Sequence, residues 1–247
     1  MSPTAPEWPT FVAKLTSRQE VAKGTVVFRF DKPTGFAFSP GQFIDIDLLN
    51  PVETDAAGNT RGFSISSAPY EGTIMVTTRL RDTAFKRTLK TIPLGTKVKI
   101  EGPFGNLRLH NAIERTAVFF AGGIGITPFR SILLDAAQRK LPHKIFLFFS
   151  NRQPEDAPYL DELQALEKQN ANYKLIATMT QMGKSNSSWK GERGYINEDM
   201  LDRCLKRACS PIYYIAGPPA MVNALHIMLQ KAGIDDDDIR TEEFAGY

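Results

Sequence analysis

Hydrophobic and polar positions follow one rhythm in the first part of the chain and another in the second. Up to about residue 110, short runs alternate apolar with polar residues, as strands with one solvent-facing side do. Turns that contain Gly or Pro separate these runs. The predicted strands are residues 25–30, 43–48, 74–79 and 97–101. Many short strands with such turns predict an antiparallel sandwich or barrel.

Beyond Asn111, continuous apolar runs alternate with patterns of helical period. This β-α-β order predicts a doubly wound parallel sheet with helices on both faces. We therefore expect a two-domain β + α/β protein, divided into residues 1–110 and 111–247. The predicted strands are 117–121, 145–149, 175–178 and 212–215, and the predicted helices are 129–138, 159–168, 197–208 and 220–231.

Composition and charge exclude several classes of protein. The net charge of +3 is small and the basic residues are scattered, which argues against nucleic-acid binding. No apolar run is long enough to cross a bilayer, and the first residues lack the features of a secretory signal, so a cytoplasmic location is expected. The acidic run Asp235–Asp238 is interpreted as a solvated loop or helix start.

Cysteine and histidine usage bears on metal sites. The two cysteines, Cys204 and Cys209, are too few for an iron–sulfur cluster held by this chain, which needs four ligands. The three histidines are scattered, so a structural zinc site is not expected, and both thiols are interpreted as buried or half-buried.

Two glycine-containing loops suit a nucleotide site. Gly122–Thr127 follows the apolar strand 117–121, and Gly217-Pro218-Pro219 follows the strand 212–215. In an open α/β sheet, ligands bind beyond the carboxyl ends of the strands, so the two loops are expected to face each other across one cleft. Backbone amides at the helix start attract an anion such as a dinucleotide pyrophosphate, and Pro128 is expected at the first helical position. The alternative is a tight connection without a ligand.

The segment 61–67 carries a cation, an aromatic ring and hydroxyls. Strand alternation places Arg61 and Phe63 on one face and Ser64 and Ser66 on the other. A flavin would use an arginine for phosphate, an aromatic ring for stacking and a hydroxyl for a ring nitrogen. The alternative is an ordinary strand with a surface arginine.

Six motifs in order along the chain resemble the ferredoxin–NADP reductase superfamily. The similarity runs over nearly the whole length and spans the change from β to α/β patterning. The motifs are Pro40-Gly41-Gln42-Phe43, Arg61-Gly62-Phe63-Ser64, Gly102-Pro103-Phe104-Gly105, Gly122–Pro128, Ser150-Asn151-Arg152 and Gly217-Pro218-Pro219-Ala220-Met221.

This resemblance implies a Greek-key β-barrel that binds flavin, FAD before FMN, followed by a domain that binds NADPH or NADH. It implies that Arg61 contacts the flavin pyrophosphate, that Phe63 packs on the flavin and that Ser64 lies near its reactive nitrogen. The remaining residues implied to contact a cofactor are Gly62, Thr77, Thr78, Thr83, Lys86, Gly122, Gly123, Gly125, Thr127, Pro128, Ser150, Asn151, Arg152, Gly217, Pro218 and Met221.

Two departures from the superfamily pattern stand out. Where many members have Gly-x-x-Ser, this chain has Thr83-Ala84-Phe85-Lys86. We interpret Thr83 as the cap of a short helix whose first amides bind phosphate, with Lys86 adding charge. Ala216 stands where many relatives have a cysteine, so a thiol near the hydride path is absent.

The end of the chain and the region after the second apolar strand bear on the cofactors. Several relatives end with an aromatic residue that covers the flavin, which here is Phe244 or, less favoured, Tyr247. Arg152 and Ser150 favour the 2′-phosphate of NADPH. Glu155 and Asp156 offer the alternative of NADH, or of capping the next helix.

The resemblance implies a flavin-dependent reductase that takes hydride from NAD(P)H and passes single electrons to a separate acceptor. A ferredoxin, a flavodoxin or an oxygenase component fits that acceptor. Two alternatives remain open: a reductase of ferric chelates or free flavin, and a non-catalytic electron-transfer subunit of a larger complex.

Overall fold

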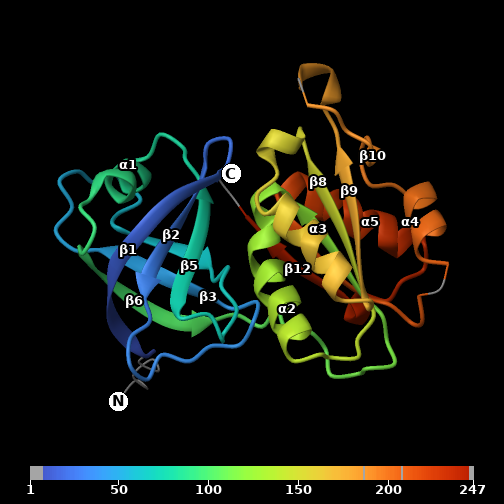
Figure 1. Cartoon of the computed structure of the whole chain (residues 1–247), viewed down its shortest axis with the longest axis horizontal. Coiled ribbons are helices and arrows are strands. Elements are labelled where there is room, and N and C mark those ends of the chain that lie inside the picture. Colours follow the sequence, from blue (N-terminus) through green and yellow to red (C-terminus); the bar gives the residue numbers. More distant parts are fainter. Residues whose placement is uncertain (1–7, 186, 207, 245–247) are drawn as a thin grey trace, which may run out of the picture.

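The computed structural model describes residues 8–185, 187–206 and 208–244. Two six-stranded sheets lie side by side, one antiparallel and one parallel (Figure 1). The strands of the first sheet end at Phe104 and those of the second begin at Ala117. The predicted combination of an antiparallel β unit with a doubly wound α/β unit is confirmed.

The antiparallel sheet closes on itself. Its strand order is β4-β3-β6-β1-β2-β5. Just beyond β4, Ile65 forms an antiparallel bridge with Val76 of β5, and the Ser66 amide donates to the Met75 carbonyl at 2.8 Å. The two ends of the strand order therefore meet, as in a barrel. The strands are β1 (Thr10–Ala22), β2 (Thr25–Asp31), β3 (Phe43–Leu48), β4 (Thr60–Ser64), β5 (Thr73–Arg79) and β6 (Lys97–Phe104).

Strand β1 was not predicted, although it is 13 residues long. Its pairing with β2 shifts register between Leu15 and Ser17 and again between Glu20 and Ala22. Each shift breaks the alternation of inward and outward side chains, which is the signal on which strand prediction depends.

A short helix, α1 (Ala84–Thr91), follows β5. Thr83 caps it, with its hydroxyl accepting from the Lys86 amide at 3.3 Å, as predicted. Phe85 and Leu89 anchor the helix in the core of the antiparallel unit.

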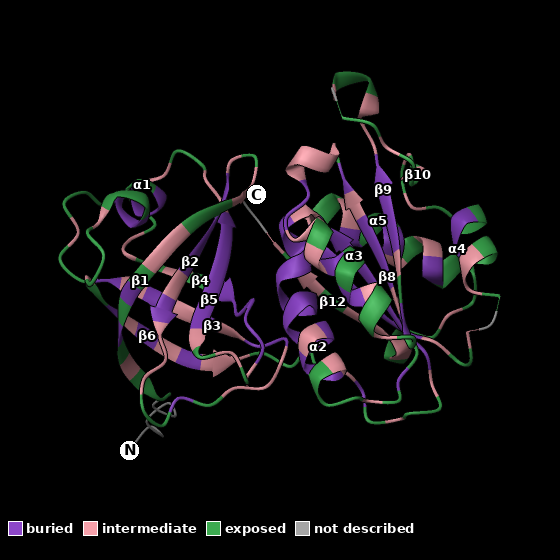
Figure 2. Ribbon diagram, viewed as in Figure 1, coloured by how far each residue is buried: buried purple, intermediate pink, exposed green. Residues whose placement is uncertain are grey.

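The parallel sheet has the strand order β10-β9-β8-β7-β11-β12. All residues of β7 and β11 are buried, and Figure 2 shows the sheet lying between helices with exposed outer faces. The strands are β7 (Ala117–Gly122), β8 (Ile145–Asn151), β9 (Tyr173–Met179), β10 (Glu192–Arg193), β11 (Ile212–Gly217) and β12 (Ile239–Glu243).

Alternate residues of the central strand pack against different helices. Phe119 shares a core with α2 (Ile126–Gln138) and α3 (Leu160–Gln169). Phe120 shares another with α4 (Glu198–Cys204) and α5 (Pro219–Lys231). Helices therefore cover both faces of the sheet. Short 3₁₀ helices lie at Gly123–Gly125, Pro154–Asp156, Met182–Lys184 and Asp236–Asp238.

Several predicted boundaries are wrong. Helix α2 begins at Ile126, so Pro128 is its third residue and not its first; the 3₁₀ turn before it winds directly into the helix. Glu155 and Asp156 do not cap α3, which begins after Tyr159 in the left-handed region at φ 63°. Helix α4 ends at Cys204, so Cys209 lies outside it and is exposed, not buried or half-buried as expected, whereas Cys204 is half-buried. Strand β12 was not predicted.

Arg130 of α2 joins the two units. Its side chain is buried, donates to the Ser66 carbonyl at 2.6 Å and pairs with Glu71 and Glu162. Ser131 beside it donates to the Ser67 carbonyl at 2.7 Å. Because Ser66 and Ser67 follow β4, these contacts tie the helix after the glycine loop to the end of that strand.

Candidate nucleotide and flavin sites

The two glycine-containing loops meet at the point where the order of parallel strands reverses. Strand β7 lies beside β8 on one side and β11 on the other, so the loops after β7 and β11 share one edge of the sheet. A Cβ built on Gly125 would lie 2.1 Å from the Ala216 carbonyl oxygen, and one on Gly217 would lie 3.2 Å from the Gly122 Cα. The predicted facing of the loops is confirmed, and packing between them requires glycine at position 125.

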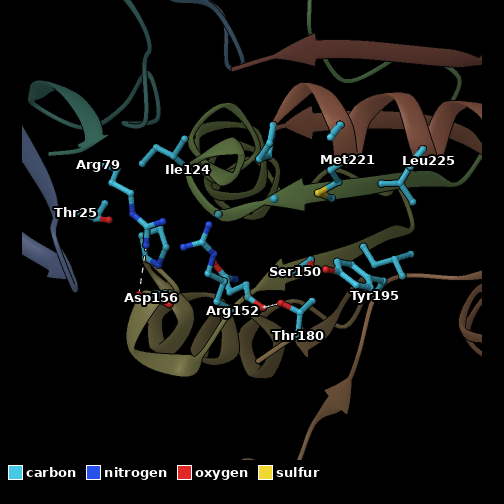
Figure 3. A pocket seen from close by; sticks show the side chains of 18 of the residues that line it. Thr25, Arg79, Ile124, Ser150, Arg152, Asp156, Thr180, Tyr195, Met221 and Leu225 are labelled. Atoms are coloured by element: carbon cyan, nitrogen blue, oxygen red, sulfur yellow. Dashed lines mark hydrogen bonds and ion pairs between the residues drawn. The ribbon is translucent and has the colours of Figure 1, made fainter. Parts of the chain in front are cut away.

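A pocket of about 550 Å³ opens beside these loops and takes residues from both units. Thr25 and Arg79 come from the antiparallel unit (Figure 3). Figure 3 shows Arg79, Asp156 and Arg152 at one end of the pocket, and Met221, Leu225 and Tyr195 toward the other. The pocket therefore has one charged end and one largely apolar end. Gly122, Gly123, Ser150, Asn151 and Pro218 also line it.

Asn151 lines this pocket and has an unsatisfied side-chain amide. Its side chain is only 6% exposed, and neither its amide nitrogen nor its amide oxygen has a hydrogen-bond partner among the described residues. A buried amide without partners is costly, so this position indicates a place where a ligand completes the hydrogen bonding.

The two acidic residues near Arg152 are engaged elsewhere. The Glu155 carboxylate accepts from the hydroxyls of Ser185 and Ser187 at 2.7 to 3.0 Å, and so ties down the loop after β9. Asp156 pairs with Arg79 at 3.4 Å. Arg152 is exposed and lines the pocket. Neither acidic side chain therefore neutralises the positive charge that Arg152 brings to the pocket.

Four residues predicted to contact a nucleotide lie outside the pocket lining, namely Gly125, Thr127, Pro128 and Gly217. Thr127 is buried, and its hydroxyl donates to the Ile124 carbonyl at 3.0 Å. Pro128 is buried beside it in the first turn of α2. Both shape the turn after β7.

Arg61 is held by the loop before β4. Its guanidinium pairs with Asp55 at 3.0 Å and donates to the carbonyls of Ala57 and Gly58, each at 2.8 Å. It lies 5.3 Å above the Phe85 ring, and the Phe63 ring lies 5.8 Å from the same ring. Arg61 and Phe63 thus share one face, as alternation predicted, and Phe63 is buried in the core of the antiparallel unit. Between them, Gly62 pairs with Asp45 of β3.

Ser64 faces the other way and meets a residue that the sequence pattern did not indicate. Its hydroxyl donates to the Glu242 carboxylate at 3.2 Å, across 178 positions of sequence. Burial raises the pKa of Glu242 to about 7, and the hydrogen bond from Ser64 offsets only part of that rise. This contact depends on β12, whose parallel pairing with β11 could not be predicted from a five-residue charged segment.

Thr77 and Thr78 are both buried in β5. The Thr77 hydroxyl bonds to the hydroxyls of Ser66, at 3.0 Å, and of Tyr159. Thr78 donates to the Arg79 carbonyl at 3.3 Å. Neither lines the pocket.

Lys86 lies buried in the first turn of α1, where its ammonium donates to the Arg79 carbonyl at 3.0 Å. Burial, together with the charges of Arg81 and Arg61, lowers the pKa of Lys86 to about 8. Positive charge is therefore concentrated at the start of α1.

Phe244 is half-buried after β12. Its amide donates to the Gly217 carbonyl at 2.9 Å, and its ring packs against the core beneath α2. The prediction for Tyr247 lies outside the described residues.

Comparison with known proteins agrees with this geometry. The family described as the oxidoreductase NAD-binding domain matches residues 119–226. A ferredoxin NADP⁺ reductase from Neisseria gonorrhoeae, solved with bound FAD and NADP, superposes with a TM-score of 0.78 at 20% identity over 95% of this chain and 98% of that chain. The chain therefore has the fold of a ferredoxin NADP⁺ reductase.

The curated relatives of this chain include larger proteins. One component of the Na⁺-translocating NADH-quinone reductase of Methylococcus capsulatus is 30% identical over 87% of this chain and 57% of its own length. The electron transfer component XylA of the xylene/toluene monooxygenase of Pseudomonas putida is 28% identical over 94% of this chain and 65% of its own. The chain spans about half the length of the curated NADH-quinone reductase relatives that it matches.

The residues near α1 fit the pyrophosphate of a flavin such as the FAD bound in the Neisseria gonorrhoeae reductase. Arg61, the buried Lys86 and the amides at the start of the helix bring positive charge to one place, where burial and the neighbouring cations lower the pKa of Lys86. Within the described residues, no group of three or more His, Cys, Asp or Glu side chains could hold a metal ion, and no helix is long and apolar enough to cross a membrane.

Proposed function

We propose that this chain is a flavin-dependent NAD(P)H oxidoreductase that delivers electrons one at a time to a separate acceptor. The observation that carries the proposal is the pocket at the strand-order reversal, which both units line and whose lining includes Asn151, a residue with an unpartnered side-chain amide among the described residues. Such crevices are where open α/β sheets bind nucleotides.

The pocket's two ends suit the two parts of a dinucleotide. Arg152 supplies positive charge for phosphates at one end, and Arg79 lies at the same end, paired with Asp156. The apolar side chains of Met221 and Leu225 at the other end suit a flat base. With Glu155 occupied by two serine hydroxyls, Arg152 and Ser150 favour NADPH over NADH.

The flavin site of the proposal lies on the antiparallel unit. Arg61 and the start of α1 would hold the pyrophosphate of FAD, and Ser64 with Glu242 would border the reactive edge of its ring. Bound FAD would supply hydride acceptance and one-electron donation, chemistry that no side chain provides. With a pKa near 7, the Glu242 carboxyl can hold a proton at neutral pH and share it with the Ser64 hydroxyl.

The acceptor is proposed from the names of relatives. XylA is an electron transfer component of a monooxygenase, and a relative from Chromohalobacter salexigens is the reductase subunit of a glycine betaine monooxygenase. We infer that an oxygenase component is the first acceptor to test, with ferredoxin and flavodoxin next. Two cysteines cannot supply the ligands of a cluster within this chain.

The experiment is an anaerobic titration of the flavin-loaded protein with NADPH and, separately, with NADH, followed in the visible spectrum. We expect stoichiometric bleaching by NADPH and slower bleaching by NADH. Arg152→Ala should remove this preference, whereas Arg193→Ala, which removes an exposed cation of β10, should keep it. A preference for NADH in the unmodified protein would overturn the role of Arg152. Flavin that neither nucleotide bleaches would overturn the proposed reductase.

A further inference from the structure

Asp55 occupies the centre of the cationic site at the start of α1. Its carboxylate oxygen Oδ1 accepts from the Arg61 guanidinium at 3.0 Å and from the Ala57 amide at 3.0 Å. Its other oxygen, Oδ2, accepts from the Ala84 amide, the first of α1, at 3.2 Å. One carboxylate thus bridges an arginine and a helix N-terminus, the two kinds of donor that bind phosphate.

Two other carboxylates near α1, those of Glu53 and Asp82, pair with a cation other than Arg61. Glu53 and Asp82 both pair with Arg87, which is exposed on the outer side of the helix. Asp55 is therefore the carboxylate that faces Arg61 among these three. Burial raises the pKa of Asp55, but the amides of Ala57 and Ala84 and the charge of Arg61 lower it further, so this carboxylate is ionised at neutral pH.

We propose that Asp55 is an internal substitute for flavin phosphate, which the pyrophosphate of FAD must displace from Arg61 and the start of α1. This inference rests on the proposed function for its ligand. Both anions need the same donors, and like charges cannot share them without a large cost. Asp55 then lowers the affinity of the apoprotein for flavin nucleotides and makes the bound flavin exchangeable.

Flavins that differ only in phosphate separate this effect from recognition of the ring. FAD and FMN carry phosphate and compete with Asp55, whereas riboflavin does not reach the site. Neutralising Asp55 should therefore tighten FAD and FMN and leave riboflavin unchanged.

The test compares the unmodified chain with Asp55→Asn, by quenching of flavin fluorescence with FAD, FMN and riboflavin. Asparagine keeps an acceptor for the loop amide and removes the charge. We expect FAD and FMN to bind about tenfold more tightly, equal to about 1.4 kcal/mol, and riboflavin to change by less than about twofold. Glu53→Gln is the matched control, because it removes one negative charge from the same loop but from Arg87.

Inorganic pyrophosphate gives a readout that needs no flavin. Its stabilisation of the apoprotein, followed as a shift in Tm, should be larger in Asp55→Asn than in the unmodified chain or in Glu53→Gln. If none of the three flavins binds either protein, the proposed function fails, while the pyrophosphate shift still decides the role of Asp55. Equal pyrophosphate shifts, or weaker FAD binding in Asp55→Asn, would show that Asp55 only orients Arg61 and would overturn the inference.

Discussion

The nucleotide pocket and the site around Arg61 differ in how their polar groups are satisfied. In the pocket, the side-chain amide of Asn151 has no hydrogen-bond partner among the described residues, and Arg152 is exposed. Around Arg61, the guanidinium already has Asp55 and backbone carbonyls as acceptors, and Ser64 already has Glu242. In the first site only Arg79 must exchange a carboxylate partner, Asp156, for ligand atoms, whereas in the second both Arg61 and Ser64 must exchange one. A site whose polar groups already await the ligand favours high affinity. A site whose polar groups must first leave internal partners allows those partners to control the affinity.

The largest effect is expected where two backbone loops touch. A methyl group on Gly125 would lie 2.1 Å from the Ala216 carbonyl oxygen and 2.8 Å from the Gly217 nitrogen. Gly125→Ala must therefore separate the loops, and we expect a loss of about 3 kcal/mol in the free energy of unfolding. Urea denaturation measures this loss. Gly183→Ala, with open space at its Cβ, is the control, and an equal stability of the two variants would contradict the packing role.

The second prediction concerns the pH dependence of stability that Glu242 causes beside Ser64. Its folded pKa of about 7 lies above the ordinary 4.5, so its contribution to stability is fully present below pH 4.5 and is lost as the pH rises through about 7. Glu242→Gln should be more stable than the unmodified chain by about 2 kcal/mol at pH 8, and should differ little at pH 4. Thermal unfolding of both at the two pH values checks this, with exposed Glu243→Gln as control. A gain in stability of Glu242→Gln that does not depend on pH would refute the raised pKa of Glu242.

Asn151 tests whether the pocket trades stability for binding. Replacing the unpartnered amide by the similarly sized side chain in Asn151→Leu should raise the free energy of unfolding by about 1.5 kcal/mol without nucleotide. The same change should weaken NADPH binding about tenfold, measured by calorimetry. Asn223→Leu, on the exposed side of α5, should do neither. Loss of stability in Asn151→Leu would mean that the amide has a structural role.

The smallest effect concerns the cap of α1. Thr83→Ala removes the acceptor for the Lys86 amide and should cost about 1 kcal/mol, measured by thermal unfolding. Thr83→Ser keeps the hydroxyl and should restore most of the loss. If both variants unfold like the unmodified chain, the cap contributes nothing, and the start of α1 is held by Asp55 and the core residues Phe85 and Leu89.

Local pattern was a good guide to the elements. The apolar run before Gly122 predicted a central strand, and all six residues of β7 are buried. The capping role of Thr83 was also predictable, because a cap depends on residues three positions apart. Bulges hid β1, and β12 was missed because a strand at the sheet edge needs few apolar residues.

The candidate site was only partly predictable. Ser150, Asn151, Arg152, Pro218 and Met221 were selected from the sequence and do line the pocket. Arg79 and Thr25 were not selected for it, since they belong to the other unit and reach the pocket only after the two units pack together.

The sequence by itself determined the division into an antiparallel and a parallel unit, the glycine loops and the residue types of the two sites, because these depend on neighbours within a few positions. Only the tertiary structure decided which side chains meet. Ser64 finds Glu242 across 178 positions, and Asp55 reaches both Arg61 and the start of α1. Such contacts follow from how the sheets close and pack, and no local pattern encodes the distance between residues so far apart in the chain.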